Sequence, residues 1–278
     1  MPKTKKPVLL YHLNDYAPSG LEFAEIKARF LEYLDNSRLV QIHDLAIPPL
    51  DTMALGFVTG QLALSPYSGR MVIYGNCAPR RKSKKAQKDN IDYGVKYARL
   101  KNGVEIVNVY SEYAFGFVKD EIEVFHDLKV PNSGSQFRSR DFFPEAVAKI
   151  INGNYEDLGK KLDVSLIPDI PHNLIAWTDG FGNLKTTMRL SDLKNMGLGP
   201  GDKVQVILNG VSMLGVVSIG GFQVERGVLA INAGSSGYDD PFIELFLRVH
   251  HMREKTAAVR FDYPEGGTPF ELKRIDAD

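Results

Sequence analysis

The chain has 278 residues, of which 44% are hydrophobic and 24% charged, a composition typical of a folded globular protein and unlike that of a disordered one. Basic and acidic residues both number 34, so the formal net charge is zero, which disfavours a nucleic-acid or membrane-surface role driven by overall charge. The single cysteine, Cys77, excludes an internal disulfide and a cysteine metal cluster. We find no apolar stretch that predicts a membrane span or a signal peptide, and we expect a cytoplasmic protein.

The first part of the chain alternates apolar runs, which predict buried strands, with amphipathic segments, which predict helices. The expected strands are 7–13, 39–42 and 70–75, and the expected helices are 21–34 and 51–64. This order predicts parallel strands joined by crossover helices, and such sheets bind ligands outside the carboxyl ends of their strands. Asn14, Asp15 and the segment 75–77 follow two of those ends.

The pattern changes after the third strand. The stretch 80–88 is strongly basic and has no apolar anchor. We favour a solvated loop over a pocket lid, and we rank a nucleic-acid patch last because no aromatic residues are interleaved. Alternating runs on either side of Asn102-Gly103 then predict a β-hairpin with a type I′ turn, and a further helix is expected over 141–153.

A change of composition near Pro168 and Pro171 predicts a linker, which divides the chain into an N-terminal α/β domain (1–165) with a mostly parallel sheet and a smaller C-terminal β domain (166–278). Turn signals separate the strands of the second domain. These expected strands are 174–177, 183–188, 203–208, 211–218, 228–233, 242–249 and 257–261.

Composition and periodicity predict no reaction. The chain has no glycine-rich phosphate loop or nucleophile elbow, and its six histidines do not have the spacing of zinc ligands. We therefore expect no metal site.

Several short segments do resemble a known family. Residues 136–144 (QFRSRDFFP) resemble the motif T-F-H-G-R-D-x-F-x-P, and 179–187 (DGFGNLKTT) resemble D-x-F-G-N-x-x-T-N. Weaker matches occur in the same order along the chain, at 13–15, 47–51, 235–238 and 243–245. Together they are similar to the S-adenosyl-L-methionine (SAM) hydroxide adenosyltransferases, which are related to the bacterial fluorinase and chlorinase; this chain resembles a divergent member.

The resemblance implies a fold, an assembly and a reaction. The fold is an N-terminal α/β domain followed by a C-terminal β-barrel-like domain. The assembly is a homotrimer that holds SAM between the N-terminal domain of one subunit and the C-terminal domain of the next. In the reaction, water or hydroxide attacks C5′ of SAM and gives adenosine and L-methionine, with no cofactor beyond SAM itself and no nucleic-acid or membrane partner.

The resemblance also implies two acidic contacts to the substrate. Asp15 would accept hydrogen bonds from the ribose diol, for which a carboxylate has two suitable oxygens. Asp179 would pair with the ligand ammonium. Each also has a plainer interpretation, as an aspartate at a helix start or in a turn.

Four further residues are implied to bind the substrate. Phe181 would pack against the adenine, although a core phenylalanine is almost as good an interpretation. Asn183 would bind the adenine edge through its amide, and Ser235 and Ser236 would hold the ligand carboxylate. For these three polar residues the alternative is an ordinary turn.

The segments around the reacting carbon depart from the family pattern. Asn76 and Cys77 stand where the family has D-P-G-V-G, and Arg138 replaces a histidine. Cys77 is a poor base for water and Arg138 cannot accept a proton. Ser139 occupies the position of a serine that contacts the halide in the fluorinase. We assign Asn76, Cys77, Arg138 and Ser139 to the catalytic region.

The sequence therefore supports three hypotheses of function. The first is an enzyme that cleaves SAM. The second is a SAM- or adenosine-binding protein with degenerate or altered chemistry, including a halide as nucleophile. The third, based on the basic stretch, is a protein that binds nucleic acid.

Overall fold

The computed structural model describes residues 6–16, 20–77, 94–235, 239–249 and 255–275. The chain divides into two compact units, Met1–Asp169 (unit 1) and Ile170–Asp278 (unit 2), where the sequence placed the boundary after residue 165. Each unit is built on one seven-stranded sheet. The two units are described separately below.

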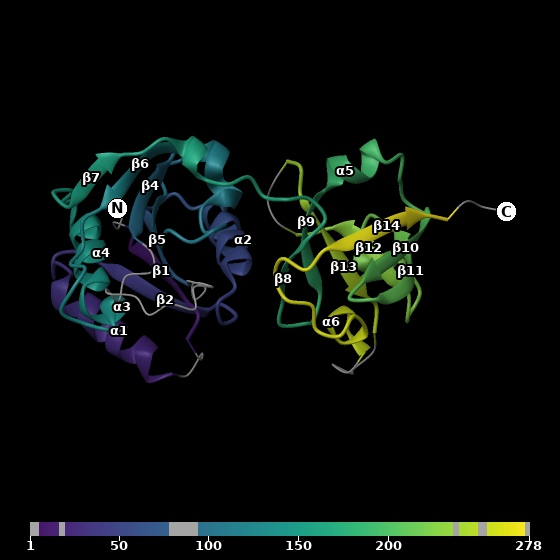
Figure 1. The fold of residues 1–278 in the computed structure, drawn as a ribbon, viewed down its shortest axis with the longest axis horizontal. Helices are drawn as coiled ribbons and strands as arrows, with labels where there is room; N and C mark the ends of the chain where they lie inside the picture. Colours follow the sequence, from purple (N-terminus) through teal and green to yellow (C-terminus); the bar gives the residue numbers. More distant parts are fainter. Residues whose placement is uncertain (1–5, 17–19, 78–93, 236–238, 250–254, 276–278) are drawn as a thin grey trace, which may run out of the picture. The chain divides into compact units, whose positions relative to one another are not determined.

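Unit 1 has the strand order β2-β1-β3-β5-β4-β6-β7, with α1, α3 and α4 on one face of the sheet and α2 on the other (Figure 1). Its elements are β1 (Val8–Asn14), α1 (Leu21–Tyr33), β2 (Val40–Ala46), α2 (Thr52–Ala63), β3 (Met71–Asn76), β4 (Val95–Leu100), β5 (Glu105–Val109), η1 (Gly116–Glu121), β6 (Ile122–Leu128), α3 (Arg138–Asp141), α4 (Phe143–Asn152), β7 (Leu158–Lys161) and η2 (Val164–Leu166).

The sheet of unit 1 is mixed, whereas the sequence predicted a mostly parallel one. Strands β2, β1, β3 and β5 are parallel neighbours, but β4 pairs antiparallel with both β5 and β6, and β6 pairs antiparallel with β7. The cause is the hairpin at Asn102-Gly103, which reverses the chain between β4 and β5. The parallel strands remain contiguous, so their carboxyl ends still form one edge.

One layer of the unit 1 core lies between the sheet and helices α1 and α4. Phe23, Ile26 and Phe30 form the buried face of α1 at helical spacing. Helix α4 has Pro144 in its first turn and ends at Gly153, whose φ of 86° is left-handed. Apolar spacing and residues suited to the two ends therefore account for these helices.

Helix α2 packs closely against the segment before η1. A Cβ atom built on Gly56 would lie 2.1 Å from the backbone oxygen of Tyr113 and 3.1 Å from the ring of Phe117. Alanine is otherwise the better helix residue. Because a backbone oxygen cannot rotate away, we expect Gly56→Ala to lower the free energy of unfolding by about 1–3 kcal/mol, measured by chemical denaturation. Gly199→Ala, which meets no atom within 4 Å, is the control. Equal stability of the two variants would contradict the expectation.

Unit 2 has the strand order β14-β10-β11-β12-β13-β9-β8, with one parallel pair, β11 and β12. Its elements are β8 (Ile175–Thr178), β9 (Leu184–Arg189), α5 (Leu190–Asn195), β10 (Lys203–Leu208), β11 (Val211–Val217), η3 (Gly221–Gln223), β12 (Leu229–Ala233), β13 (Phe242–Leu247), α6 (Ala257–Arg260) and β14 (Phe270–Arg274).

The sheet of unit 2 curls until its two outer strands approach each other. Leu174, just before β8, forms an antiparallel bridge with Pro269, just before β14. The amide of Ile175 donates to the oxygen of Thr268 (2.9 Å). The curled sheet encloses its own apolar core. This arrangement is a half-barrel, so the expected barrel-like form is present only in part.

One predicted strand of unit 2 is wrong. Residues 257–260 form helix α6 rather than part of a strand, and Phe261 follows as its C-cap. The hydroxyl of Thr256 accepts a hydrogen bond from the amide of Val259 (3.4 Å) and so caps the first turn. A short apolar run has no clear period, so the cap decides its structure.

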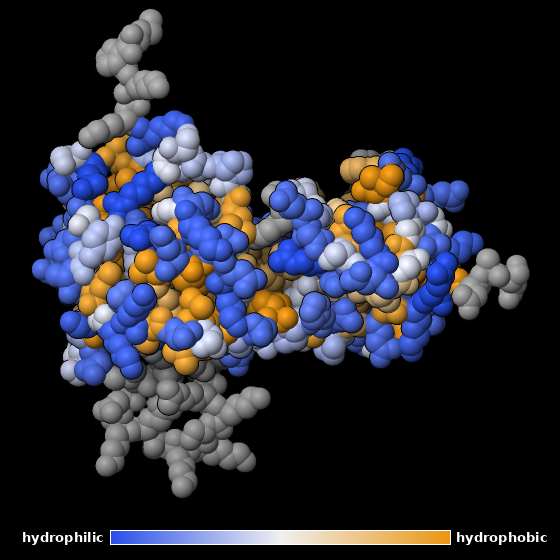
Figure 2. Space-filling model, turned by 90° about the horizontal axis from the view of Figure 1, so that it is seen from above, coloured by the Kyte–Doolittle hydropathy of each residue, from blue (hydrophilic) through white to orange (hydrophobic). Residues whose placement is uncertain are grey.

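On the face shown in Figure 2, hydrophilic residues surround smaller groups of apolar residues in both units. Such scattered exposure of apolar side chains is normal for a folded protein surface. Within the described ranges, none of the helices combines the length and the apolar character that crossing a membrane requires.

Candidate functional site

The parallel strands of unit 1 create a switch point between β1 and β3. From β1 the chain passes through α1 to β2 on one side, and it returns through α2 to β3 on the other side of β1. Crevices at the carboxyl ends of such strands are the usual ligand sites of these sheets. Asn14 and Asn76 are directly paired in the register, and the amide of Asp15 lies 3.4 Å from the oxygen of Asn76. The residues predicted from the two strand ends are therefore neighbours.

The carboxylate of Asp15 is held by the loop that enters α2. Its Oδ2 accepts a hydrogen bond from the amide of Leu50 (3.1 Å), and its carboxylate also hydrogen-bonds the Cys77 thiol. Burial raises the pKa of Asp15, and these two hydrogen bonds oppose the rise. Helix α1 begins after Gly20, so Asp15 does not cap it. Asp15 is a partly buried carboxylate at the switch point.

The same loop has an unusual backbone. Leu50 has a φ of 63°, a left-handed conformation that costs a residue with a side chain about 1–3 kcal/mol. The next residue, Asp51, accepts the amide of Ala54 (2.8 Å) and caps α2. Strain of this kind collects at binding sites. Here the left-handed conformation of Leu50 directs its amide toward the carboxylate of Asp15.

Cys77 is fully buried beside Asp15. Burial raises the pKa of its thiol above the ordinary value, and the carboxylates of Asp15 and Asp51 raise this pKa further. The backbone oxygen of Cys77 accepts the hydroxyl of Ser111 (2.7 Å). Cys77 is therefore a neutral thiol near neutral pH and is not a base for water.

The neutral state of Cys77 is open to a direct test. We expect iodoacetamide to alkylate it at least about tenfold more slowly in the folded protein at pH 8 than after unfolding in guanidinium, because only an accessible thiolate reacts. Mass spectrometry of timed samples measures both rates. Equally fast alkylation in the two states would show that the thiol is exposed and ionised.

A second polar group lies beside Asp15, on the side of helices α1 and α3. The hydroxyl of Tyr16 lies 2.6 Å from Ser139 Oγ and accepts a hydrogen bond from Asn76 Nδ2 (3.1 Å). Ser139 is only 6% exposed, and its backbone oxygen lies 3.4 Å from the hydroxyl of Tyr74. Ser139 and Asn76, both predicted from sequence, therefore meet through Tyr16. Sequence patterns did not indicate Tyr16, because its partner is 123 residues away.

Arg138 has different surroundings from those the sequence suggested. Its Nε donates to the backbone oxygen of Pro131 (3.1 Å), and its guanidinium lies over the ring of Phe143, 5.2 Å from the centroid. Burial lowers the pKa of Arg138. These contacts tie its charge to the start of α4. They do not connect it with Asn76 or Cys77.

Three of the predicted residues of unit 2, Asp179, Phe181 and Asn183, lie on the turn between β8 and β9. Oδ1 of Asp179 accepts the amides of Phe181 (2.9 Å) and Asn183 (3.0 Å), and Oδ2 accepts Asn183 Nδ2 (3.0 Å). Asp179 thus organises the turn, and the Asn183 amide is directed at Asp179. Phe181 is 82% exposed, which excludes its interpretation as a core phenylalanine.

A lysine completes this group. Lys185 Nζ pairs with Asp179 Oδ2 (3.3 Å) and with the carboxylate of Glu244, which lies opposite Lys185 in the β9–β13 register. The three side chains are only 12–16% exposed. A Cβ built on Gly234 would lie 3.9 Å from Glu244 Oε2, so the exposed Ser235 is close by. Two carboxylates and one ammonium leave this cluster with a formal charge of −1.

Ser236 and the basic stretch 80–88 lie outside the described residues.

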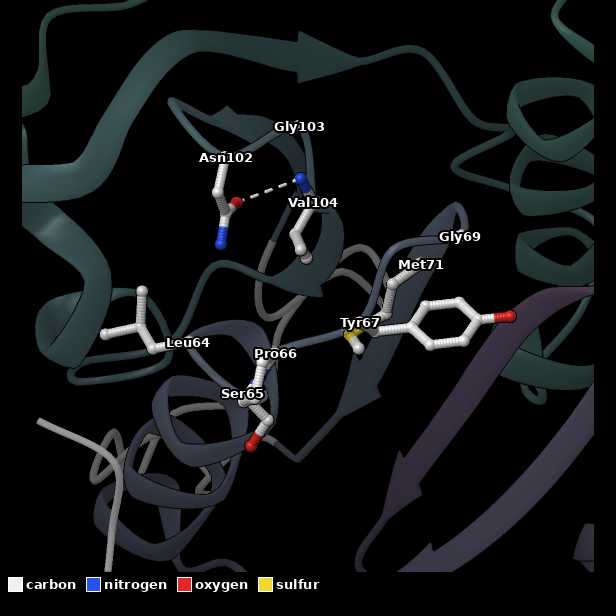
Figure 3. A pocket seen from close by; sticks show the side chains of 9 residues that line it. All are labelled: Leu64, Ser65, Pro66, Tyr67, Gly69, Met71, Asn102, Gly103 and Val104. Carbon is white, nitrogen blue, oxygen red and sulfur yellow. Dashed lines mark hydrogen bonds between the residues drawn. The ribbon is translucent and has the colours of Figure 1, made fainter. Parts of the chain in front are cut away.

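A hollow at the opposite edge of unit 1 contains none of the predicted site residues (Figure 3). It has about 190 Å³ of space and lies near Met71 and Val104, at the amino-terminal ends of β3 and β5. The side chain of Asn102 lines it, but its Oδ1 accepts the amide of Val104 (3.1 Å) and its Nδ2 donates to the oxygen of Ala63 (2.8 Å). The side chain of Asn102 is therefore engaged in holding the hairpin.

Comparison with known proteins identifies the fold and no family. No family model matches the chain, and no curated protein does. A crystal structure of an uncharacterized conserved protein from Thermotoga maritima is 16% identical, with a TM-score of 0.74 over 95% of this chain and 100% of that one. A conserved hypothetical protein from Thermus thermophilus is 20% identical, with a TM-score of 0.65 over 96% of this chain and 100% of that one. The whole two-unit architecture therefore recurs in other proteins.

Proposed function

We propose that this protein binds SAM and cleaves it at C5′, giving adenosine and L-methionine. The observation that carries the proposal is the carboxylate of Asp15 at the switch point, held by the strained Leu50 amide and by Cys77. A fixed carboxylate in a strand-end crevice suits a ribose diol, because its two oxygens accept two hydroxyl hydrogens. The order of the motifs along the chain supports the same ligand.

The charges of the site suit a sulfonium. Asp15 and Asp51 are the carboxylates that act on Cys77, and Arg138 is tied to Pro131 and Phe143. A cationic ligand gains from such surroundings, since opposite charges attract more strongly where water is excluded.

The proposed reaction requires little acid–base chemistry. The oxygen of water or hydroxide forms a bond to C5′ while the C5′–S bond breaks, and its electron pair stays on sulfur as neutral methionine leaves. When water attacks, the proton it loses passes to solvent. The leaving group needs no proton, so the enzyme contributes mainly by orienting and desolvating the nucleophile.

The cluster of unit 2 is proposed to hold the amino-acid end of SAM. An amino acid carries an ammonium and a carboxylate. Glu244 and Asp179 offer negative charge to the ammonium, while Lys185 and Ser235 suit the carboxylate. Since Asp179 already organises its turn, Glu244 is the better ammonium partner. The resemblance favours a homotrimer in which this cluster serves the unit 1 site of a neighbouring subunit, which analytical ultracentrifugation would test.

A second candidate function is binding without turnover. It is favoured by the neutral Cys77 and by the packing of Arg138 on Phe143, because the residues that stand at the family's catalytic positions then supply no base. A SAM- or adenosine-binding protein would keep Asp15 and lose the chemistry.

One experiment separates the two candidates. The protein is incubated with SAM in ¹⁸O-labelled water, with and without chloride, and products are resolved by liquid chromatography and mass spectrometry. We expect adenosine labelled at the 5′ oxygen and an equal amount of methionine. A chlorinated nucleoside would identify halide as the nucleophile. Binding of SAM in calorimetry with no product selects the second candidate. If the protein neither binds SAM nor forms a product, both candidates are overturned.

A further inference from the structure

Three polar side chains near the proposed reaction site form a short chain of hydrogen bonds. Asn76, at the end of β3, donates through Nδ2 to the hydroxyl of Tyr16 (3.1 Å), and that hydroxyl lies 2.6 Å from Ser139 Oγ. Asn76 precedes Cys77 and Tyr16 follows Asp15. The chain therefore runs directly alongside the carboxylate that we assign to the ribose.

The direction of the first hydrogen bond follows from the chemistry of its groups, and that of the second is our assignment. An amide nitrogen only donates, so the Tyr16 oxygen is the acceptor from Asn76. Either hydroxyl can donate in the 2.6 Å contact between Tyr16 and Ser139 Oγ, and we assign the one hydrogen of the phenol to this contact. Burial raises the pKa of Tyr16 to about 12, so the phenol keeps this hydrogen at neutral pH. Ser139 Oγ is thus the acceptor from Tyr16.

The hydrogen of the Ser139 hydroxyl is then left to donate elsewhere. Within the part of the chain that the structure describes, Tyr16 is the only hydrogen-bond partner of Ser139 Oγ. Ser139 is 6% exposed, and a buried donor without a partner is costly. A ligand atom with a lone pair would satisfy it.

Aromatic packing keeps the tyrosine in place. The ring of Tyr16 makes edge-on contacts with Phe23 and Phe137, with centroids 6.1 and 5.7 Å away. These contacts restrain the ring without using its hydroxyl. Removing only the hydroxyl would therefore leave the packing intact.

We propose that Tyr16, held by Asn76, is a positioning residue that fixes the hydroxyl of Ser139 as a hydrogen-bond donor to the nucleophile at C5′. The inference rests on the function proposed above. A fixed donor orients an atom with a free electron pair, such as water, hydroxide or a halide, and keeps another of its lone pairs directed at carbon. It removes no proton from the nucleophile.

The first test is a double-mutant cycle on turnover. We expect Tyr16→Phe to lower kcat about tenfold and to leave the KM for SAM within about twofold. Ser139→Ala should lower kcat at least as much. Because Tyr16 acts through Ser139, the double variant should be no slower than Ser139→Ala. If the two losses of kcat multiply in the double variant, or if kcat is unchanged in Tyr16→Phe, the proposal is overturned.

Asn76→Asp is a nearly isosteric control for direction. A carboxylate accepts from Tyr16, so Tyr16 would accept from Ser139, and Ser139 would lose its outward donor. We expect a fall in kcat close to that of Ser139→Ala. A kcat like that of the wild type would mean that the direction of the hydrogen bonds is irrelevant.

A readout without substrate separates this inference from the proposed reaction. In the free protein we expect a slowly exchanging hydroxyl resonance, assigned by its loss in Tyr16→Phe, with a nuclear Overhauser effect to the β-protons of Ser139. Ser139→Ala should abolish its protection. If the wild type shows this signal but no turnover, the hydrogen-bond chain stands and the proposed reaction fails. If the signal is absent, the chain itself is overturned, whatever the turnover.

Discussion

Replacing Asp15 by alanine is expected to weaken the binding of SAM by about 1.5–3 kcal/mol, which is more than tenfold in affinity. The loss is that of a hydrogen bond made by a charged group. Titration calorimetry measures it directly. Asp163→Ala is the matched control, because Asp163 is an exposed aspartate of the same unit that only caps a short turn at Ser165. Equal affinities of the two variants and the wild type would show that Asp15 does not contact the ligand.

The pKa of Asp15 gives this prediction a second test. Because burial raises the pKa of Asp15 in the folded state, folding favours the protonated form. The contribution of this group to stability is therefore present at low pH and is lost as the pH rises through its folded-state pKa. Asp15→Asn should then be no less stable than the wild type at pH 7 but should bind SAM more weakly. If Asp15→Asn is less stable than the wild type at pH 7 and also binds SAM more weakly, the result would point to a structural role for Asp15.

Replacing Glu105 by alanine is expected to lower the free energy of unfolding by about 3–5 kcal/mol, the cost of removing one partner of a buried ion pair. Glu105 is 3% exposed. Its Oε2 accepts Arg70 Nε (2.7 Å), and its Oε1 accepts the hydroxyls of Tyr97 and Tyr155 (2.9 Å each). Arg70 also donates to the last carbonyls of α4, at 2.6 Å from the oxygens of Ile150 and Ile151. One carboxylate thus links the sheet to the helix.

The sheet offers a matched control for Glu105. Glu123 pairs with Arg99 at 3.2 Å, but their side chains are 56% and 46% exposed. An exposed ion pair contributes about 0–1 kcal/mol, so Glu123→Ala should lie within about 1 kcal/mol of the wild type. Chemical denaturation followed by circular dichroism compares the two. Similar losses in both variants would contradict the assigned importance of burial.

The sequence predicted those parts of the fold that depend on local pattern. The spacing of Phe23, Ile26 and Phe30 specifies α1, and the continuous apolar run 70–75 specifies β3, a short strand that is buried over nearly its whole length. Strand order could not be read in this way. The place of β4 between β5 and β6 depends on its pairing with β6, which lies beyond the hairpin in the chain.

The two Asn-Gly turns show that local sequence does not always determine the type of a turn. At Asn209-Gly210 both residues have positive φ, 51° and 73°, which is the type I′ turn that this dipeptide favours. At Asn102-Gly103 only Gly103 is left-handed, and the amide of Leu100 bonds the oxygen of Val104 across a three-residue loop. The type I′ prediction was wrong there, since Asn102 instead bonds Ala63 of α2.

The candidate site was predictable to a similar extent. Asp15, Asn76 and Cys77 follow predicted strand ends and were assigned to the site by the family resemblance, and the parallel pairing of β1 and β3 brings those strand ends together. Tyr16 and Lys185 were missed, because each acquires its partners only through tertiary contacts, to Ser139 and to Glu244. The surroundings of Arg138 were also unpredictable, since Pro131 and Phe143 define them.

The charges of the outer strand β14 are expected to protect the sheet of unit 2 against aggregation. β14 is an outer strand that carries Glu271, Lys273 and Arg274, charges that discourage strand pairing with another molecule. Beside it lies β10, with the sequence KVQVIL, which is rich in β-branched residues. A chain shortened before Phe270 would expose the backbone of β10 and also unpair Asn173, whose oxygen accepts the Phe270 amide (2.9 Å). Such a truncation would leave β10 as an unpaired edge strand, with which strands of other molecules can pair to form fibrils.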